Sequence, residues 1–409
     1  MVKPPLGGNI YNMSRMTTKI KDDGFSIIVA ENIEDVEQLR EIWERMQWDP
    51  YGDIDYYLNE VRLGDNQVRP YAIVLSSHGI PKALLAGRVE ETSFEITFGY
   101  KAIFRKKVRL LSVRSGAIMG ETSDSICAAL ISELNNYLRR GQADMVILGN
   151  LRLDSCLYRI ATTVPGFWEH DHFPARDFKW RLHLGGSFDD YLGTLSRNTR
   201  DNLRKVGNRL KRKYGNRLSL KCYSRKEELE IIMRDIEKIA SRSWQRAAGV
   251  GFVDDFATHS KYEFALNHGW LRVYILYIDD NPVTFRQGLR YGDTYYGEIT
   301  GMDPEYREDR LGTFLLLKVI ENLCSDRNVK LIDFGAGADH AEHKGIFCDE
   351  RLEGADVRIF RPNIQGAMLN MVASASEIAR VLGKSALGRM GILKRLRKSW
   401  REHALAGKK

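Results

Sequence analysis

The start of one apolar helix carries residue types that bind phosphate. The segment Arg307-Glu308-Asp309-Arg310-Leu311-Gly312-Thr313 leads directly into the apolar run FLLLKVIENL. The first N–H groups of a helix have no partner within it, and a glycine lets phosphate approach the backbone closely. Arginine adds charge and threonine a hydroxyl, although an ordinary helix start with solvated arginines would look similar. We expect an anionic cofactor to bind here, at Arg307, Arg310, Leu311, Gly312 and Thr313.

A second group of polar side chains follows the strand-like run VKLIDFGAG. It contains Asp339, His340, His343 and Lys344. Histidine exchanges protons near neutral pH, so His343 can serve in proton transfer. The acidic and imidazole groups could instead hold a metal, but their spacing is not that of the zinc motifs, and we expect no metal. We expect Asp333, on the strand itself, to be structural.

A carboxylate and a phenol alternate on the strand-like run Thr294-Tyr295-Tyr296-Gly297-Glu298-Ile299-Thr300. Side chains two residues apart on a strand share a face, so Tyr296 and Glu298 should lie together. A carboxylate in a cleft can take the proton from an attacking amine. The alternative is a solvated carboxylate on an exposed strand face.

The basic segment SRNTRDNLRKVGNRLKRKYG predicts a helix with Ser196 as its N-cap. Arg197, Arg200 and Arg204 recur at helical spacing, so three guanidinium groups can converge on one face. Such a face binds phosphate, carboxylate or a nucleic-acid backbone, and we expect these arginines, together with Asp339, to contact substrate. The alternative is a solvated helix face, which is the common reason for a run of charges.

The elements that must position these residues can be followed from residue 186 onward. A largely helical region runs from Ser187 to about His268 and includes the strand LSLKCYS. The hairpin LRVYILYIDDNPVTFRQGLRYGDTYYGEITG follows, with its turn at Asp279-Asp280-Asn281-Pro282, and then the helix at Gly312 and the strand VKLIDFGAG. The strand VRIFRP and a helical C-terminal tail complete the chain.

The first half of the chain repeats this order. After a loose leader come the strand SIIVA, a helix that Asn32 can cap, and a hairpin turning at His78-Gly79-Ile80-Pro81. The helix SDSICAALISELNNYLRRG, ending at Gly141, and the strand ADMVILGNL follow. Pro81 precedes Gly87 by the interval that separates Pro282 from Gly288. We expect a duplication, although any two α/β segments share some of this patterning.

The residues from about Trp180 to Asp349 resemble the GNAT-related acyltransferase domain of CelD-type proteins from exopolysaccharide or cellulose loci, relatives of the Fem peptidyltransferases. The resemblance is carried by SFDDYLGTLSRNTRDNLRKVGNRL, by the hairpin with its Gly312 helix, and by DFGAG followed by Lys344 and Phe347-Cys348-Asp349. It implies an α/β protein of tandem GNAT-like halves, each a mixed, mostly antiparallel sheet flanked by helices, with a helical C-terminal tail. The expected divisions are a flexible leader (1–24), an N-terminal half (25–185), a C-terminal acyltransferase half (186–365) and a basic helical tail (366–409).

The resemblance also implies chemistry. GNAT enzymes use acyl-CoA as a co-substrate and hold its pyrophosphate at the start of the central helix, here at Gly312. Their base often lies on the fourth strand, here at Glu298 with Tyr296. In the related family a Tyr-Lys pair follows the glycine-bearing strand; Lys344 matches that lysine, and His343 stands in place of the tyrosine. The phosphate loop departs from the usual Q/R-x-x-G-x-G/A pattern, because only Gly312 is present.

Composition limits the class of protein. The chain has 409 residues, 43% hydrophobic and 28% charged, which is enough for two ordinary globular domains. Its five scattered cysteines favour a reducing compartment over a disulfide scaffold. No secretory h-region and no apolar run approaching the ~20 residues of a membrane-spanning helix is present in the sequence. We expect a cytoplasmic protein without a tightly bound cofactor.

The net charge of +8 comes from the end of the chain. From residue 384 onward the chain contains nine lysines and arginines and one glutamate, so this segment alone has a formal charge of +8. Met390, Leu393, Leu396 and Trp400 fall on one helical stripe within it. Such a helix can lie on an anionic membrane surface, bind RNA, or pack its stripe against the protein core.

These features predict an N-acyltransferase that moves an acyl group, expected to be acetyl, from acyl-CoA to an amine of an amino sugar or a polysaccharide or envelope precursor. We expect no nucleic-acid partner and possible peripheral contact with the inner membrane face through the tail. Two alternatives stay open. One is a Fem-like aminoacyl-tRNA-dependent transferase, although the helical insert lacks a long heptad pattern. The other is a non-catalytic regulatory or membrane-associated protein on a degenerate GNAT core.

Overall fold

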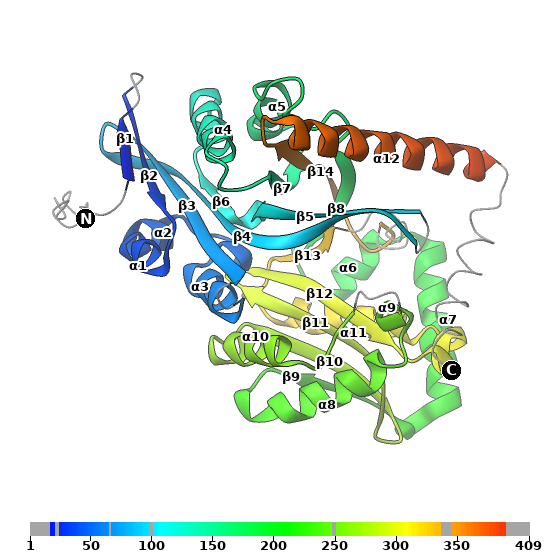
Figure 1. Cartoon of the computed structure of the whole chain (residues 1–409). Coiled ribbons are helices and arrows are strands. Elements are labelled where there is room, and N and C mark those ends of the chain that lie inside the picture. Colours follow the sequence, from blue (N-terminus) through cyan, green and yellow to red (C-terminus); the bar gives the residue numbers. More distant parts are fainter. Residues whose placement is uncertain are drawn as a thin grey trace. The chain divides into compact units, whose positions relative to one another are not determined.

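The computed structural model describes residues 17–20, 24–64, 67–98, 101–247, 251–336 and 345–389 (Figure 1). The chain forms two compact units. Unit 1 consists of Met1–Ala175 and Ala355–Glu377, and unit 2 of Arg176–Gly354 and Ile378–Lys409. The division expected after residue 185 therefore falls inside unit 2, because strand β8 (Ala175–His183) pairs with strand β13 (Leu331–Ala336) of that unit.

Unit 1 is built on a mostly antiparallel sheet. Its order is β1 (Thr17–Ile20), β2 (Phe25–Ala30), β3 (Val68–Ser77), β4 (Ile80–Phe98), β5 (Lys101–Val113), β7 (Met145–Arg152) and β14 (Glu350–Phe360), with the short β6 (Ile118–Gly120) beside β4. The β5–β7 pair is parallel. A parallel pair needs a crossover, and helix α4 (Asp124–Arg139) supplies it.

Helices cover both faces of this sheet. On one face α1 (Ile33–Gln38), α2 (Arg40–Met46) and α3 (Ile54–Leu63) bury a core centred on Trp43, whose indole donates to the carbonyl of Gly52. On the other face α4 and α5 (Cys156–Thr163) pack against the strands. The first turns of α12 (Ile364–Arg389) add Leu369 and Ala373 to a cluster with Phe360. The sequence predicted the Asn32 cap and the helix end at Gly141. The single helix expected after Asn32 forms as two, α1 and α2, divided at Leu39.

Unit 2 repeats this plan. Its strand order is β8, β13, β12 (Thr294–Met302), β11 (Asn281–Tyr291), β10 (Leu271–Ile278) and β9 (Leu218–Tyr223), and only β12 and β13 are parallel. Helices α8 (Leu229–Ala240) and α10 (Phe256–Asn267) cover one face (Figure 1). Helices α6 (Phe188–Thr194) and α11 (Leu311–Ser325) cover the other. Helix α7 (Arg197–Tyr214) packs Val206 and Leu210 against Leu311, at the start of α11.

The two central hairpins show the duplication in detail. In β3–β4 the turn residues His78 and Gly79 have φ of 49° and 77°, and in β10–β11 Asp279 and Asp280 have φ of 49° and 58°. Each hairpin also has a register irregularity just before its turn, where a proline of the second strand pairs with the first. The shared turn and irregularity place Pro81 and Pro282 at equivalent positions and confirm the tandem fold expected from sequence.

Within the described ranges, no helix has the length and apolar character needed to cross a membrane.

Candidate active site in unit 2

The two parallel strands of unit 2 separate partway along their length. Strand β12 pairs with β13 only from Thr294–Leu331 to Tyr296–Asp333. Beyond this point β12 continues to Met302 and β13 to Ala336 without pairing to each other. Each separated edge leaves backbone N–H and C=O groups that need a partner from elsewhere, so the opening suits a ligand with amide groups.

A bulge in β12 lies where the separation begins. Gly288 pairs with Gly297 and Gln287 with Ile299, so Glu298 is the extra residue. The exposed Glu298 carboxylate accepts a hydrogen bond from the Gln287 amide at 2.5 Å. Tyr296, which is buried, lies opposite Leu289 on the face that α8 and α10 cover. The hydrogen bond holds Glu298 toward the Gln287 side of the sheet, the same face as Tyr296.

The start of α11 carries no side-chain cap. Its N-cap residue, Arg310, has the left-handed conformation with φ of 57° and ψ of 33°. Gly312 lies in the first turn, and a Cβ added there would meet only the Met302 sulfur, at 4.0 Å. The N–H groups of Thr313 and Phe314 donate to the Arg310 carbonyl, at 3.1 and 3.2 Å, so those of Leu311 and Gly312 are the candidate donors to a ligand. The helix dipole favours an anion beside them. Arg307 and Arg310 are exposed, and Thr313 is half-buried.

Helix α7 holds the loop before α11 in place. The Asp309 carboxylate accepts hydrogen bonds from Lys213 Nζ at 2.7 Å and from the Tyr214 hydroxyl at 2.5 Å. Burial of the carboxyl group favours its neutral form, but these bonds outweigh that effect and lower the pKa of Asp309 below its ordinary value. Arg310 also reaches Asn202 on α7, at 3.3 Å. The backbone around the start of α11 is thus fixed before any ligand arrives.

The three arginines at the start of α7 do not converge on one site. Arg200 donates to the carbonyls of Gly193 and Leu195, both at 3.0 Å, so it satisfies the C-terminal end of α6. Arg197 and Arg204 lie on either side of Asp201, at 4.0 and 3.6 Å, and both are largely exposed. Only these two stay available for a ligand, whereas the structure gives Arg200 a structural contact.

Arg286, on β11, was not anticipated from sequence. It lies opposite Tyr274 and Thr300 and projects from the sheet face that α11 covers. The residue is half-buried, but its Nε is fully buried without a hydrogen-bond partner, and no carboxylate of the described residues pairs with it. Burial lowers the pKa of Arg286 below its ordinary value, while the nearby Tyr295 has the opposite effect. A buried cation without a counter-ion is costly, so it marks a place where a ligand anion would be stabilised. The sequence signal was an arginine in the middle of a largely apolar strand.

Asp339, His343 and Lys344, the other predicted site residues, lie outside the described residues. Asp333 forms an ion pair with Arg181 at 3.1 Å and accepts from the Gly335 N–H, so its contacts are structural. Among the residues that the structure describes, no cluster of three or more His, Cys, Asp or Glu side chains is arranged to bind a metal.

The equivalent positions in unit 1 differ. There β5 pairs with β7 up to its last residue, Val113, so the strands do not separate before β5 ends. Helix α4 occupies the place of α11 and begins with Asp124, whose carboxylate pairs with Arg159. A carboxylate in the first turn repels a second anion, although the N-cap residue of α4, like that of α11, makes no side-chain capping bond. The features that suit an anionic ligand with amide groups therefore occur in unit 2.

Comparison with known proteins finds a matching family profile and similar solved structures. Residues 197–345 match the family profile described as "Acetyltransferase (GNAT) domain". The structure is similar to that of FemX, with 9% sequence identity and a TM-score of 0.55 over 83% of this chain and 98% of that one. A tandem GNAT protein from the clavulanic acid biosynthesis pathway is 12% identical over 82% of this chain and 99% of that one, with a TM-score of 0.48. The C-terminal domain of a putative lysylphosphatidylglycerol synthetase from Agrobacterium fabrum is 12% identical over 83% and 94%, with a TM-score of 0.49. No curated protein matches the chain.

Proposed function

From the GNAT acyltransferase fold of this chain, we propose that it is an acyl-CoA-dependent N-acyltransferase. The donor is an acyl-CoA, in the first instance acetyl-CoA, and the acceptor an amine on an amino sugar or a polysaccharide or envelope precursor. The observation that carries the proposal is the separation of β12 from β13 beside the uncapped start of α11. The protein acts in the cytoplasm, as a member of the CelD-type group that its sequence resembles.

Coenzyme A has two chemical features that fit this place. Its pantetheine arm contains two amides, which can pair with the open edges of β12 and β13 as an added strand would. Its pyrophosphate can accept hydrogen bonds from the first N–H groups of α11, where Gly312 leaves room. Arg307 and Arg310 supply charge beside the same helix start. In unit 1 the β5–β7 pair continues to the last residue of β5, and the first turn of α4 carries Asp124, so we assign the donor to unit 2.

The acceptor amine must lose a proton as it attacks the thioester. In the proposed reaction the C–N bond forms, the C–S bond breaks, and the thiolate takes a proton as it leaves. Glu298, with Tyr296 on the same face, is the proposed base for the amine proton. N–H groups freed by the bulge can stabilise the negative charge that develops on the carbonyl oxygen. His343 and Lys344 are the proposed groups for protonating the thiolate and holding the substrate.

The half-buried guanidinium of Arg286, whose Nε has no partner, adds a preference for an anionic substrate. Arg286 lies on the sheet face that α11 covers, two residues along β11 from Thr284. Thr284 pairs with Met302, and the Met302 side chain lies next to Gly312 at the start of α11. In the proposed complex its charge is neutralised by a carboxylate or phosphate of a bound substrate. A ligand anion that supplies the missing counter-ion of Arg286 would bind with a strong gain in free energy.

A second candidate is an aminoacyl-tRNA-dependent transferase. The observation in its favour is the exposed cationic side of α7, where Arg204 and Lys205 stand near a helix start that can bind phosphate. RNA binding through such a face would weaken steeply as salt rises. The similarity to FemX extends over both units but bears on the fold only.

Calorimetric titration of the purified protein with acetyl-CoA distinguishes these candidates. We expect saturable binding, followed by acceptor-dependent release of free thiol when amino sugars and nucleotide-linked amino sugars are supplied. Failure to bind acetyl-CoA or any longer acyl-CoA would overturn the proposal. Binding of aminoacyl-tRNA in its place would favour the second candidate, and binding of neither donor would favour a non-catalytic protein.

A further inference from the structure

Unit 1 exposes a group of large apolar side chains on one loop and one helix. In the loop over residues 164–173, Phe167 is 65% exposed and Trp168 56%. On the first turns of α12, Ile364 is 92% exposed and Met371 59%. Single exposed hydrophobic residues are ordinary, but a contiguous set of this size on a soluble protein usually marks a binding surface. We call this set the aromatic-loop surface.

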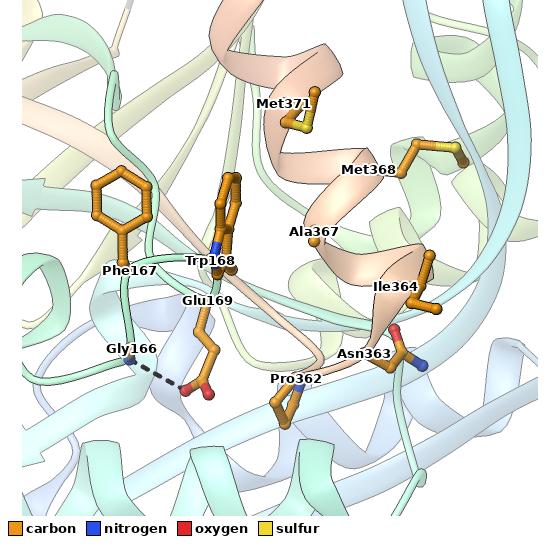
Figure 2. Close-up of a pocket in the computed structure, with 10 residues that line it drawn as sticks. All are labelled: Gly166, Phe167, Trp168, Glu169, Pro362, Asn363, Ile364, Ala367, Met368 and Met371. Atoms are coloured by element: carbon orange, nitrogen blue, oxygen red, sulfur yellow. Dashed lines mark hydrogen bonds between the residues drawn. The ribbon is translucent and has the colours of Figure 1, made fainter.

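The surface surrounds an open pocket of about 520 Å³. Figure 2 shows the rings of Phe167 and Trp168 on one side and the side chains of Met368 and Met371 along the helix on the other. The two strongly polar side chains of the lining are already engaged: Glu169 accepts from the Gly166 N–H, and Asn363 from the Gly366 N–H. What faces the pocket is therefore carbon and sulfur.

Buried polar contacts hold the loop in this exposed position. Asn370 on α12 is 1% exposed and donates to the carbonyls of Trp168 at 3.1 Å and His170 at 2.7 Å. Asp171, which is also buried, lies 3.4 Å from Arg358 and accepts from the Phe173 N–H at 3.0 Å. Polar groups are expensive to bury. Their use here fixes the backbone beneath two rings that face solvent, so the exposure is a built feature of the loop and not a consequence of a loose chain.

The chemistry of the surface matches a lipid interface. Tryptophan is favoured where water meets lipid, and isoleucine, methionine and phenylalanine insert between acyl chains. Ile364, Met368 and Met371 follow one another at i, i+4 and i+7 on α12, so they form one exposed stripe. The same helix leads into the segment from residue 384 onward, whose formal charge is +8. Apolar insertion combined with a cationic segment is what an anionic bilayer binds.

We propose that the aromatic-loop surface is where this protein docks on an anionic lipid bilayer, with an acyl chain occupying the pocket. The proposal does not depend on acyl transfer. In this proposal the side chains that insert into the bilayer belong to unit 1. The basic segment from residue 384 onward attracts the protein electrostatically to the anionic lipids, and the aromatic loop makes the apolar contact.

The test is sedimentation of the full chain with two kinds of vesicle, neutral phosphatidylcholine and phosphatidylcholine with a third of phosphatidylglycerol. We expect binding to the anionic vesicles. The double variant Phe167→Ser, Trp168→Ser should bind them at least ~10-fold more weakly, because two inserted rings are removed. Phe256→Ser is the matched control, since Phe256 is 80% exposed on unit 2 and should not matter. Removal of residues 390–409 should weaken binding in low salt and matter less in high salt.

Two results would overturn the proposal. One is equal vesicle binding by the wild type and the double variant. The other is a change in oligomeric state in the double variant, measured by light scattering without lipid, which would make the surface an interface between copies of the chain. A second measurement uses the native ring itself: the fluorescence difference between wild type and Trp168→Phe should shift to the blue on adding anionic vesicles. No shift would show that Trp168 stays in water.

Discussion

Replacing Gly312 with alanine separates phosphate binding from protein stability. A Cβ at this position meets only the Met302 sulfur at 4.0 Å, an ordinary contact, so the protein itself has room for it. Alanine is a better helix residue than glycine by roughly 0.5–1 kcal/mol. We therefore expect Gly312→Ala to fold normally, with a melting temperature equal to or up to ~4 °C above that of the wild type.

The same methyl group lies where phosphate would approach the helix start. If it displaces the phosphate enough to lose one charge-assisted hydrogen bond, the loss is about 1.5–3 kcal/mol, or roughly 10- to 150-fold in Kd. Isothermal titration with acetyl-CoA measures this change directly. Acetyl-pantetheine, which has no phosphate, should bind the wild type and the variant equally well.

Gly207 provides the matched control. It lies inside α7, where an added Cβ meets nothing within 4 Å, so Gly207→Ala should give the same gain in helix stability without touching the donor. Equal acetyl-CoA affinity in Gly312→Ala and the wild type would refute the phosphate site. A similar loss in Gly207→Ala, or an equal loss for acetyl-pantetheine, would show that the effect does not arise at the phosphate.

Further substitutions test the other parts of the site. Glu298→Gln should lower kcat about 10²- to 10⁴-fold with acetyl-CoA affinity unchanged, and an unaltered kcat would exclude Glu298 as the base. Arg286→Met removes a buried charge without a counter-ion, so it should leave the melting temperature equal or higher while weakening the anionic substrate about tenfold or more; a strong loss of stability would reveal a structural role. Asp309→Asn should lower the melting temperature by roughly 2–6 °C at pH 7, because the bonds from Lys213 and Tyr214 weaken. The pKa of Asp309 is lowered in the folded state. Its contribution to the free energy of unfolding is therefore complete above its unfolded pKa of about 3.9, and it disappears as the pH falls through its folded pKa. The difference in melting temperature between the wild type and Asp309→Asn should shrink below about pH 4. A difference that stays constant with pH would contradict this explanation.

Local chemistry was sufficient to predict most of the fold. Both hairpins could be predicted because their turn residues tolerate positive φ, as at His78-Gly79 and Asp279-Asp280. Helix ends could be predicted where a side chain or glycine specifies them, as at Asn32 and Gly141. The sequence could not predict that residues 355–377 belong to unit 1, because tertiary packing decides which strands distant in sequence pair with each other.

The site was only partly predictable for the same reason. The sequence indicated an open helix start at Gly312, and the structure has one. It could not indicate that β12 and β13 separate, because the sequence of one strand does not determine how far it pairs with another. Nor could spacing on α7 show that Arg200 turns toward the carbonyls of α6. The sequence also could not show that Arg286 lies on the face covered by α11, with its Nε buried and no carboxylate beside it.

We propose that the two halves have divided their work. They share the hairpins, the central helix and the parallel strand, yet each uses the critical helix start differently. Neither helix start has a side-chain cap, but α11 begins beside a separated strand pair, whereas α4 carries Asp124, paired to Arg159, in its first turn. A half freed from binding a donor can present other surfaces, and the aromatic loop belongs to that half. Under this division, the double variant Phe167→Ser, Trp168→Ser should weaken lipid binding and keep acetyl-CoA affinity, and Gly312→Ala should weaken acetyl-CoA binding and keep lipid binding. A variant of either kind that impaired both activities would mean that the halves do not act separately.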